Sequence, residues 1–502
     1  MQTLDLVIIF GYLIGITVFG IWYAGKQETT EDYFVGDRSV PWWAISMSIV
    51  ATETSTITFI SVPGFAFAKG GNFQFLQLVL GYMVGRVVIS LVFIPMYFRG
   101  ELQTVYQLLG QRFGGRVKML ASGLFVIMRN IADGIRLLLT AIVLAAVYTA
   151  FQPNTDPTIV IVGSIVLLGL VMIIFTFYGG MEAVIWIEVV QLVIYIAGAV
   201  AAAVVLIQNI EGGFSGAVAI GQQFDKFDVF DFSFDLAKTY TFWGGLIGGC
   251  FLTMSTHGTD QFLVQRYLCT NKPRAAIAAL MSSGAVVFGQ FIGFLFIGVL
   301  LFAFYEPFSM AGYETATGAF PFTGGDKVFP DFITQKMPTG LAGLVVAAIF
   351  AAALSSSLNS IAATAVNDIY KPFAKDTSDR HLMRIAGILT VVVGIVQIAI
   401  AVGLKDVNSS ALGLALAVAS LINGPILGVF LVGAFLKRAK EIHALTGMTV
   451  SILLMTYILL SSNKFVAGPV IAWPWYALIG SMTTLIVAYI ASLIIPSNEN
   501  EI

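Results

Sequence analysis

The chain alternates between long apolar segments and short polar connections. A helix crosses the hydrocarbon core of a bilayer, about 30 Å thick, with roughly 20 apolar residues. On that scale the sequence predicts thirteen membrane-spanning helices. The first span has no basic stretch before it and is longer than the apolar part of a signal peptide, which favours a retained helix. The predicted spans are 4–25, 41–68, 74–98, 119–150, 158–177, 182–209, 239–258, 275–304, 340–366, 382–404, 409–436, 444–462 and 472–495.

Polar residues and glycines interrupt this pattern at two matching places, 51–58 and 244–261. The first stretch reads Ala-Thr-Glu-Thr-Ser-Thr-Ile-Thr, and the second ends in Ser-Thr-His-Gly-Thr-Asp-Gln. Backbone that leaves the helix at membrane depth must be buried in protein or line a watery cavity. Paired broken helices in corresponding halves therefore indicate the binding site of a secondary transporter.

Each interrupted span opens a block of five spans, 41–209 and 239–436. Because five is odd, consecutive blocks enter the membrane from opposite sides and are related by inversion. This pattern resembles the five-plus-five architecture of LeuT-like transporters. We expect an all-α membrane protein with a single transporter domain over 1–502, with one extra helix (4–25) before the repeats and two (444–495) after them.

Composition and charge exclude several other classes of protein. Hydrophobic residues make up 58% and charged residues 11% of the 502 positions, so most of the chain must lie in lipid. The net charge of −2 leaves no basic stripe for a phosphate backbone, so no nucleic-acid partner is expected. Cys250 and Cys269 lie in or beside apolar segments, where two small hydrophobic side chains are expected rather than a disulfide framework.

The distribution of basic residues predicts the orientation. With the N-terminus outside, the inner loops hold sixteen Lys and Arg residues and the outer loops hold seven. Cytoplasmic loops carry the excess of basic residues. We therefore expect an integral protein of the cytoplasmic (inner) membrane with its N-terminus outside and its C-terminus inside.

Four segments carry a family resemblance: Glu31-Asp-Tyr-Phe-Val-Gly36, Tyr178-Gly-Gly-Met-Glu-Ala-Val-Ile-Trp186, Thr259-Asp-Gln-Phe-Leu-Val-Gln-Arg-Tyr-Leu268 and Ala351-Ala-Ala-Leu-Ser-Ser-Ser-Leu-Asn-Ser360. They resemble the sodium:solute symporter family in sequence and order, and the similarity covers essentially the whole chain. The resemblance implies a LeuT-like fold, a small-molecule solute and Na⁺ as the coupling ion. It does not name the solute, because members with these motifs carry chemically different solutes.

Sodium requires hard oxygen ligands, which hydroxyl groups and the carbonyls of an unwound helix supply. Two alternatives stay open: small residues could merely permit close helix packing, and in a shifted register Ala352 and Ala353 replace the first serine pair of the family. By the resemblance, the site combines two carbonyls of the second span with one carbonyl and two hydroxyls of the ninth, from Ala51, Thr54, Ala352, Ser355 and Ser356.

A second cation or a coupling proton could use Glu188 and Asn359. The family often reads Trp-Thr-Asp where this chain reads Trp186-Ile187-Glu188, so the acid is one methylene longer and the hydroxyl is missing. We expect Glu188 to tune coupling rather than to bind solute.

Charged residues within the predicted spans are costly and therefore informative. Arg129, Asp133 and Arg136 lie on one face of the fourth span, at i, i+4 and i+7. Asp133 can neutralise one arginine, which leaves the other for a substrate anion or for Glu53. A structural ion pair between Glu53 and Arg136 and direct contact of either with solute are the two alternatives, whereas Arg86 is expected to be structural or to snorkel.

The segment 51–77 aligns without a gap to the sialic-acid branch of the family, which implies a set of substrate contacts. A pocket with an aromatic wall, hydroxyls, an amide and a guanidinium suits a hydroxylated solute with a carboxylate. A neutral sugar remains the alternative, because hydrogen bonds from Gln, Ser and Thr would serve it. The implied substrate-binding residues are Ser55, Thr58, Phe73, Gln77 and Arg136, and Glu53 is a further candidate because it is a charged residue inside the broken segment, where related carriers usually have an uncharged one.

Three polar residues of the second interrupted span have more local interpretations. His257 could be a proton-sensitive gate, although helix-end capping or packing is favoured. Asp260 and Arg266 are expected to form helix-termination or intracellular gating contacts.

The sequence as a whole predicts a sodium-coupled symporter that works by alternating access and functions as a monomer in the lipid bilayer. No paired catalytic carboxylates, nucleophile or phosphate loop are present in the sequence, so neither enzymatic activity nor a cofactor is expected. Proton coupling through Glu188 or Glu53 is the alternative within transport. A transporter-like sensor or a leak channel is the alternative from another class.

Overall fold

The computed structural model describes residues 2–23, 29–54, 56–100, 102–152, 154–353, 357–406 and 421–495, with the backbone alone at 56, 57, 150, 352 and 353. Within these ranges the protein is helical, and the one β contact is an isolated bridge between Ser39 and Thr270. The α-helices are α1 (Thr3–Tyr23), α2 (Thr30–Val35), α3 (Trp42–Glu53), α4 (Thr56–Phe67), α5 (Leu76–Tyr97), α6 (Tyr106–Phe113), α7 (Gly115–Phe151), α8 (Pro157–Asn209), α9 (Gly213–Gln223), α10 (Gly249–Gly258), α11 (Gln261–Leu268), α12 (Pro273–Tyr305), α13 (Val328–Gln335), α14 (Leu341–Ala353), α15 (Leu358–Thr364), α16 (Asp379–Gly403), α18 (Asn423–Phe435), α19 (Glu441–Ser462) and α20 (Tyr476–Ile494).

Eight of the described helices are long and apolar enough to cross a membrane, and α3 with α4 forms a ninth, bent span. α8 contains 53 residues but leaves helical geometry at Gly180, where φ is 59°, a value that glycine adopts without steric cost. The helix thus covers two predicted spans, 158–177 and 182–209. Shorter apolar helices, α14 and α18, lie in the predicted ninth and eleventh spans. The total of thirteen spans stays a prediction.

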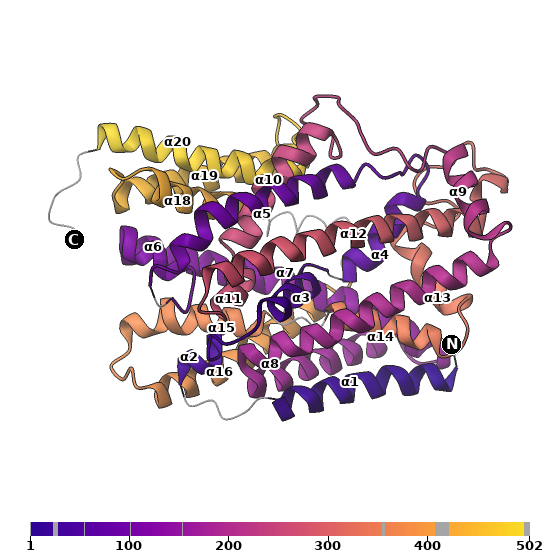
Figure 1. The fold of residues 1–502 in the computed structure, drawn as a ribbon, viewed down its shortest axis with the longest axis horizontal. Coiled ribbons are helices and arrows are strands. Elements are labelled where there is room, and N and C mark those ends of the chain that lie inside the picture. Colours follow the sequence, from indigo (N-terminus) through magenta and orange to yellow (C-terminus); the bar gives the residue numbers. More distant parts are fainter. Residues whose placement is uncertain are drawn as a thin grey trace.

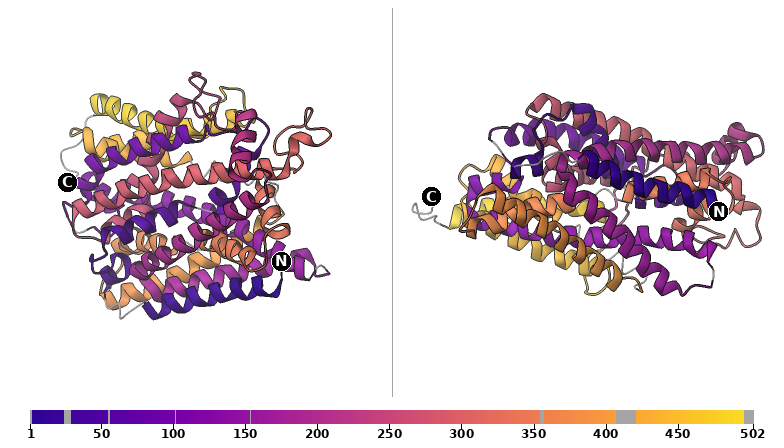
Figure 2. Two further views of the ribbon diagram at one scale, coloured as in Figure 1. Left: turned by 45° about the vertical axis from the view of Figure 1, so that its right-hand side comes forward. Right: turned by 90° about the horizontal axis from the view of Figure 1, so that it is seen from below.

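The long helices run side by side, and α1 begins at the opposite end of the bundle from the end of α20 (Figure 1). α18, α19 and α20 pack together along one edge, while α1 packs against α8 and α14 at the opposite edge. The broken helices lie between these edges, and the view from below shows the same elongated bundle (Figure 2). α12 packs against both halves of the first broken span, α3 and α4, and α5 packs against both α12 and α10.

The first predicted interruption is confirmed. α3 ends at Glu53, Thr54 is extended with φ −83° and ψ 95°, and the two halves of the span meet at 59°. The second interruption is shorter than predicted, because α10 continues to Gly258 and the chain leaves the helix only at Thr259 and Asp260. The hydroxyl of Ser255 donates to a carbonyl of its own helix, so the polar residues of this stretch do not unwind it.

Two local features fix the helices around the centre. Asp5 of α1 accepts hydrogen bonds from the backbone N–H groups of Gly340 and Gly343, at 2.7 and 2.9 Å, and so caps the start of α14. A Cβ atom at Gly81 would lie 2.2 Å from the carbonyl oxygen of Gly245, so α5 packs backbone to backbone on the π-helical turn η1 (Gly244–Gly248). The second broken span is thereby held against α5.

Lys226 fastens the end of α4 to the loop that follows α9. Its ammonium group donates to the carbonyls of Ala66, Phe67 and Ala68 at 3.0, 3.2 and 2.7 Å, where the helix dipole is negative. The same group lies 4.1 Å from the ring centre of Phe302 on α12. One buried side chain thus joins the first broken span to two neighbouring segments.

Burial lowers the pKa of Lys226 to about 7. In the unfolded chain a lysine keeps its proton up to about pH 10.4. Between about pH 7 and 10 the unfolded chain therefore binds more protons than the folded chain. The free energy of unfolding should rise with pH in that window. We expect the unfolding temperature of the wild type in detergent to rise from about pH 7 to 9 relative to that of Lys226→Met. Parallel pH profiles of the two proteins would contradict this expectation.

Candidate functional site

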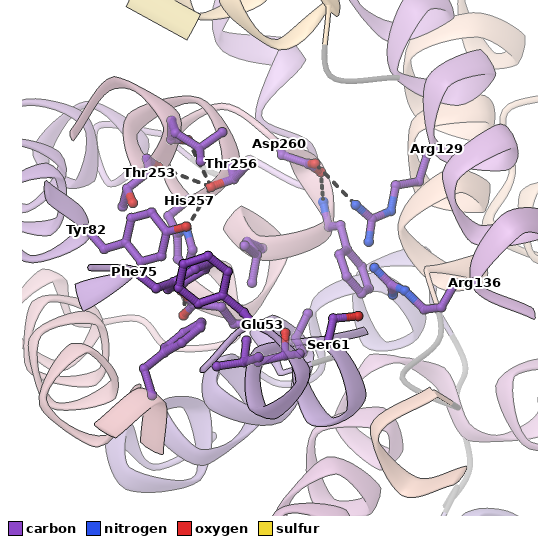
Figure 3. Close-up of a pocket in the computed structure, with 18 of the residues that line it drawn as sticks. Glu53, Ser61, Phe75, Tyr82, Arg129, Arg136, Thr253, Thr256, His257 and Asp260 are labelled. Carbon is purple, nitrogen blue, oxygen red and sulfur yellow. Dashed lines mark hydrogen bonds and ion pairs between the residues drawn. The ribbon is translucent and has the colours of Figure 1, made fainter. Parts of the chain in front are cut away.

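A pocket of about 420 Å³ lies between the two broken spans (Figure 3). Its walls come from α3 and α4, from α10 and α11, and from α5, α7 and α12, so residues more than 200 positions apart face one cavity. The lining residues are Thr52, Glu53, Thr58, Ser61, Val62, Phe65, Phe75, Tyr82, Arg129, Arg136, Tyr240, Leu252, Thr253, Thr256, His257, Asp260, Phe262, Leu263 and Phe291.

Aromatic rings close one side of this pocket. Tyr240, in the segment before η1, lies with its ring centre 4.8 Å from that of Phe65 and 5.4 Å from that of Phe75. Phe75 also stacks on Phe291 of α12 at 5.1 Å. The four rings, several of them tilted against one another, form an apolar wall suited to the carbon face of a ring-shaped solute.

The opposite wall is cationic. Arg129 and Arg136 reach into the pocket from the side opposite His257 and Tyr82 (Figure 3). Arg129 is engaged, because its guanidinium lies 3.2 Å from Asp133 and 3.5 Å from Asp260. The contact with Asp133 lies within α7, and the contact with Asp260 joins α7 to the break between α10 and α11.

Arg136 is much less engaged than Arg129. It has one ionic contact, at 3.4 Å from Asp133, and among the described residues its guanidinium makes no hydrogen bond that meets geometric criteria. Asp133 itself also accepts a hydrogen bond from the hydroxyl of Ser357. Asp133 contacts both arginines, and Arg136 is the one without a second ionic partner among the described residues, so it is the arginine left available as predicted.

Of the two alternatives for Glu53 and Arg136, the ion pair between them is wrong. Glu53 pairs with Arg86 of α5, and its Oε2 atom also lies 3.3 Å from Nε2 of His257. Arg86 is fully buried, so it does not snorkel to the membrane surface. A Cβ atom at position 284 would lie 2.7 Å from Cδ of Arg86, so Gly284 of α12 provides the space for this side chain. The pair of Glu53 and Arg86 could not be predicted, because the two residues lie far apart in the sequence and neither indicates which opposite charge it will meet.

Of the other substrate residues implied by the resemblance, Thr58 lines the pocket and Ser55 lies outside the described residues. Phe73 and Gln77 lie elsewhere in this structure. Gln77 accepts a hydrogen bond from the backbone of Asp231 at 2.8 Å, and the ring of Phe73 packs 5.4 Å from that of Phe227. Both side chains hold the loop after α9, which covers them.

Two residues of the predicted sodium site face the same small cavity. Ala51 and Thr54 line a space of about 10 Å³ together with Ala351, Gln191 and Tyr195. A space of this size holds about one water molecule. Because α3 ends beside it, carbonyls of its last turn are released from helical hydrogen bonding. The backbone of α14 reaches Ala353, whereas Ser355 and Ser356 lie outside the described residues.

Glu188 lies in a dense, fully buried network that the sequence did not reveal. Arg266 of α11 pairs with its carboxylate, and the hydroxyls of Ser48 and Thr52 donate to it. Asn359 is also engaged, accepting from Gln265 at 2.7 Å. A second cation at Glu188 and Asn359 stays a prediction, and such an ion would have to compete with a guanidinium already in place.

Asp260 fulfils its predicted role in helix termination, because its side chain accepts from the backbone N–H of Phe262 at 2.8 Å and caps α11. Sequence reasoning missed Phe75, Tyr82 and Tyr240 as pocket residues. Aromatic residues are frequent throughout this chain, so no signal in the sequence separates these three from ordinary core residues.

Comparisons with known proteins agree with this geometry. A model described as the sodium:solute symporter family matches residues 33–451. The sodium/sialic acid symporter NanT of Aliivibrio fischeri is 31% identical over 99% of this chain and 94% of its own, and SiaT of Proteus mirabilis is 31% identical over 98% and 95%. A substrate-bound, outward-open structure of a Na⁺-coupled sialic acid symporter has a TM-score of 0.84 at 30% identity, covering 99% of this chain and 98% of that one.

A more distant structure, the nucleobase-cation-symport-1 family transporter Mhp1, shares the fold alone, with a TM-score of 0.56 at 14% identity over 93% of this chain and 96% of its own. These findings confirm the predicted family, the LeuT-like fold, sodium as the coupling ion, and an integral membrane transporter rather than an enzyme. With a family match over most of its length and a relative above 30% identity over nearly all of it, the chain belongs to the sodium:solute symporter family.

Proposed function

We propose that this protein imports a carboxylated sugar of the sialic acid type together with sodium. The observation that carries the proposal is the guanidinium of Arg136, which faces the pocket and makes no hydrogen bond among the described residues. A planar guanidinium suits bidentate recognition of a carboxylate. The aromatic wall and the nearby hydroxyls of Thr58 and Ser61 suit a hydroxylated ring, and sialic acid symporters stand among the similar proteins.

Coupling follows from the position of the sodium cavity. An ion bound by carbonyls of Ala51 and Thr54 and by α14 joins the first broken span to the ninth predicted span, and so favours the state in which the solute pocket is formed. Release of the ion inside loosens this contact and frees the solute. The cavity is lined by residues of both predicted blocks, 41–209 and 239–436, so a bound ion would connect the two inverted repeats.

Orientation, location and assembly are parts of the same proposal. The excess of basic residues in one set of loops supports an N-terminus outside and a C-terminus inside, in the cytoplasmic membrane. The pocket is enclosed by helices of a single chain, which supports a monomer as the functional unit in the bilayer.

Uptake into proteoliposomes tests the proposal directly. We expect N-acetylneuraminate to accumulate when an inward sodium gradient is imposed, and to accumulate no further than in empty liposomes when potassium replaces sodium. Glucose, a neutral sugar, and lactate, an acid that is not a sugar, are tested as alternative solutes. Sodium-driven uptake of glucose with no uptake of the acid would contradict the proposed substrate class, and flux without saturation would indicate a channel.

Ser356→Ala should raise the sodium concentration needed for half-maximal uptake by roughly tenfold, because it removes one predicted hydroxyl ligand. A single interaction of this kind contributes about 1–1.5 kcal/mol, which corresponds to about that factor in affinity. Ser360→Ala is the matched control. Ser360 lies one turn further on, and its hydroxyl donates to Gln265 at 2.6 Å rather than toward the cavity. Equal half-saturation in wild type and Ser356→Ala would point to the shifted register of the serine segment.

A further inference from the structure

Glu53 presents an unused acceptor atom to the pocket. Its two recorded partners, Arg86 and His257, both contact Oε2, and among the described residues Oε1 has no hydrogen-bond donor. The side chain is 14% exposed and lines the cavity. A carboxylate oxygen in a protein pocket binds hydrogen-bond donors strongly because the acceptor is charged.

The surroundings of Glu53 hold this acceptor in place. Arg86 is fully buried and supplies the compensating charge on one side. His257 contacts Oε2 on another side, and its Nδ1 atom lies 2.9 Å from the hydroxyl of Thr256. Because two partners occupy Oε2 and neither reaches Oε1, the free oxygen is fixed in position rather than left to rotate into water.

The pocket therefore carries a negative charge, that of Glu53, on one side and a positive charge, that of Arg136, on the other. Glu53 and His257 contact each other on the side opposite Arg136, the same side of the pocket as the aromatic ring of Phe75 (Figure 3). A solute whose carboxylate lies on Arg136 places its far end toward Glu53. A second anionic group at that end would be repelled, whereas hydroxyl or ammonium groups would donate to Oε1.

We infer that Glu53 is a specificity-determining residue, which selects solutes with hydrogen-bond donors at the end remote from their carboxylate. The inference rests on the proposed function, because Arg136 must receive the carboxylate for the far end to reach Glu53. For an acidic sugar of the sialic acid type, the donors in question are the hydroxyls of its glycerol chain. The negative side chain of Glu53 would then bind the hydroxylated end of such a solute, and the positive side chain of Arg136 would bind its carboxylate.

The experiment compares two solutes across two proteins. The probes are N-acetylneuraminate and its seven-carbon analogue, which keeps the ring and carboxylate but lacks the last two hydroxyl-bearing carbons. The variant is Glu53→Gln combined with Arg86→Met, because Glu53→Gln alone leaves a buried arginine without its counter-ion. We expect the wild type to bind the full-length acid about tenfold more tightly than the shortened one, and the double variant to bind the two within about twofold.

A matched control removes a Glu–Arg pair away from the pocket. Glu31 and Arg38 lie 2.7 Å apart outside the lining, so Glu31→Gln with Arg38→Met should keep the wild-type ratio even if the absolute affinities change. A ratio that is the same in the wild type and in the Glu53→Gln/Arg86→Met variant overturns the inference.

The methyl ester of N-acetylneuraminate separates this test from the proposed function. If wild type binds the ester as tightly as the acid, the carboxylate has no partner and the proposed function fails, whatever the ratio of the long and short acids. If the ester binds weakly but the seven-carbon acid binds as tightly as the full-length acid, the proposed function stands and the role of Glu53 fails. Absence of binding to any of the three probes overturns both.

Discussion

Replacing Arg136 by lysine should reduce uptake of an acidic sugar by about 10- to 100-fold. Arg136 is the pocket guanidinium without a hydrogen bond among the described residues, so its donors are available to the solute. Lysine keeps the charge but offers a point ammonium in place of a planar fork. Each lost hydrogen bond to a charged group is worth about 1.5–3 kcal/mol, which corresponds to that range. Initial rates of sodium-driven uptake in proteoliposomes measure the effect.

The control for Arg136→Lys is a solute without the carboxylate. Binding of the methyl ester should change little, because the ester cannot form the ion pair in either protein. A double-mutant cycle of Glu53→Gln with Arg136→Gln, measured on the thermal stability of the protein without solute, should show no coupling, since the partner of Glu53 is Arg86. Equal losses for the acid and the ester would show that Arg136 shapes the pocket without contacting the carboxylate.

Glu188→Gln should lower the stability of the folded protein by about 3–5 kcal/mol, the usual cost of leaving one member of a buried ion pair without its partner. Arg266 and Glu188 are both fully buried, and Ser48 links them through hydrogen bonds to each side chain. Thermal unfolding in detergent measures the loss. The pair Glu188→Gln with Arg266→Met should recover most of it, because both charges are then absent.

Sodium dependence distinguishes the structural role of Glu188 from a coupling role. If Arg266 already neutralises this carboxylate, the stabilised double variant should keep the wild-type steepness of uptake against sodium concentration. A variant that folds normally but loses one transported ion per solute would support the second-cation site instead. Arg116→Met is a suitable control, because that side chain lies at the start of α7, outside the pocket.

Local patterns in the sequence were enough to predict the eight long apolar helices of the described residues and the first broken helix. An apolar segment of bilayer length has few alternatives to a helix. The polar run around Thr54 cannot face lipid, so its departure from the helix could be predicted and is found. The shared face of Arg129, Asp133 and Arg136 follows from helical spacing, and the structure joins these three residues as expected.

Partners from distant parts of the chain were decided by the tertiary structure. Glu53 meets Arg86 and His257, and Glu188 meets Arg266, because the packing of α3, α5, α8, α10 and α11 brings their faces together. A charged residue within a span requires some partner, and the sequence shows that requirement without showing which opposite charge meets it. Helical periodicity acts over a few residues, whereas the burial of a charge is resolved by whichever group the fold places beside it.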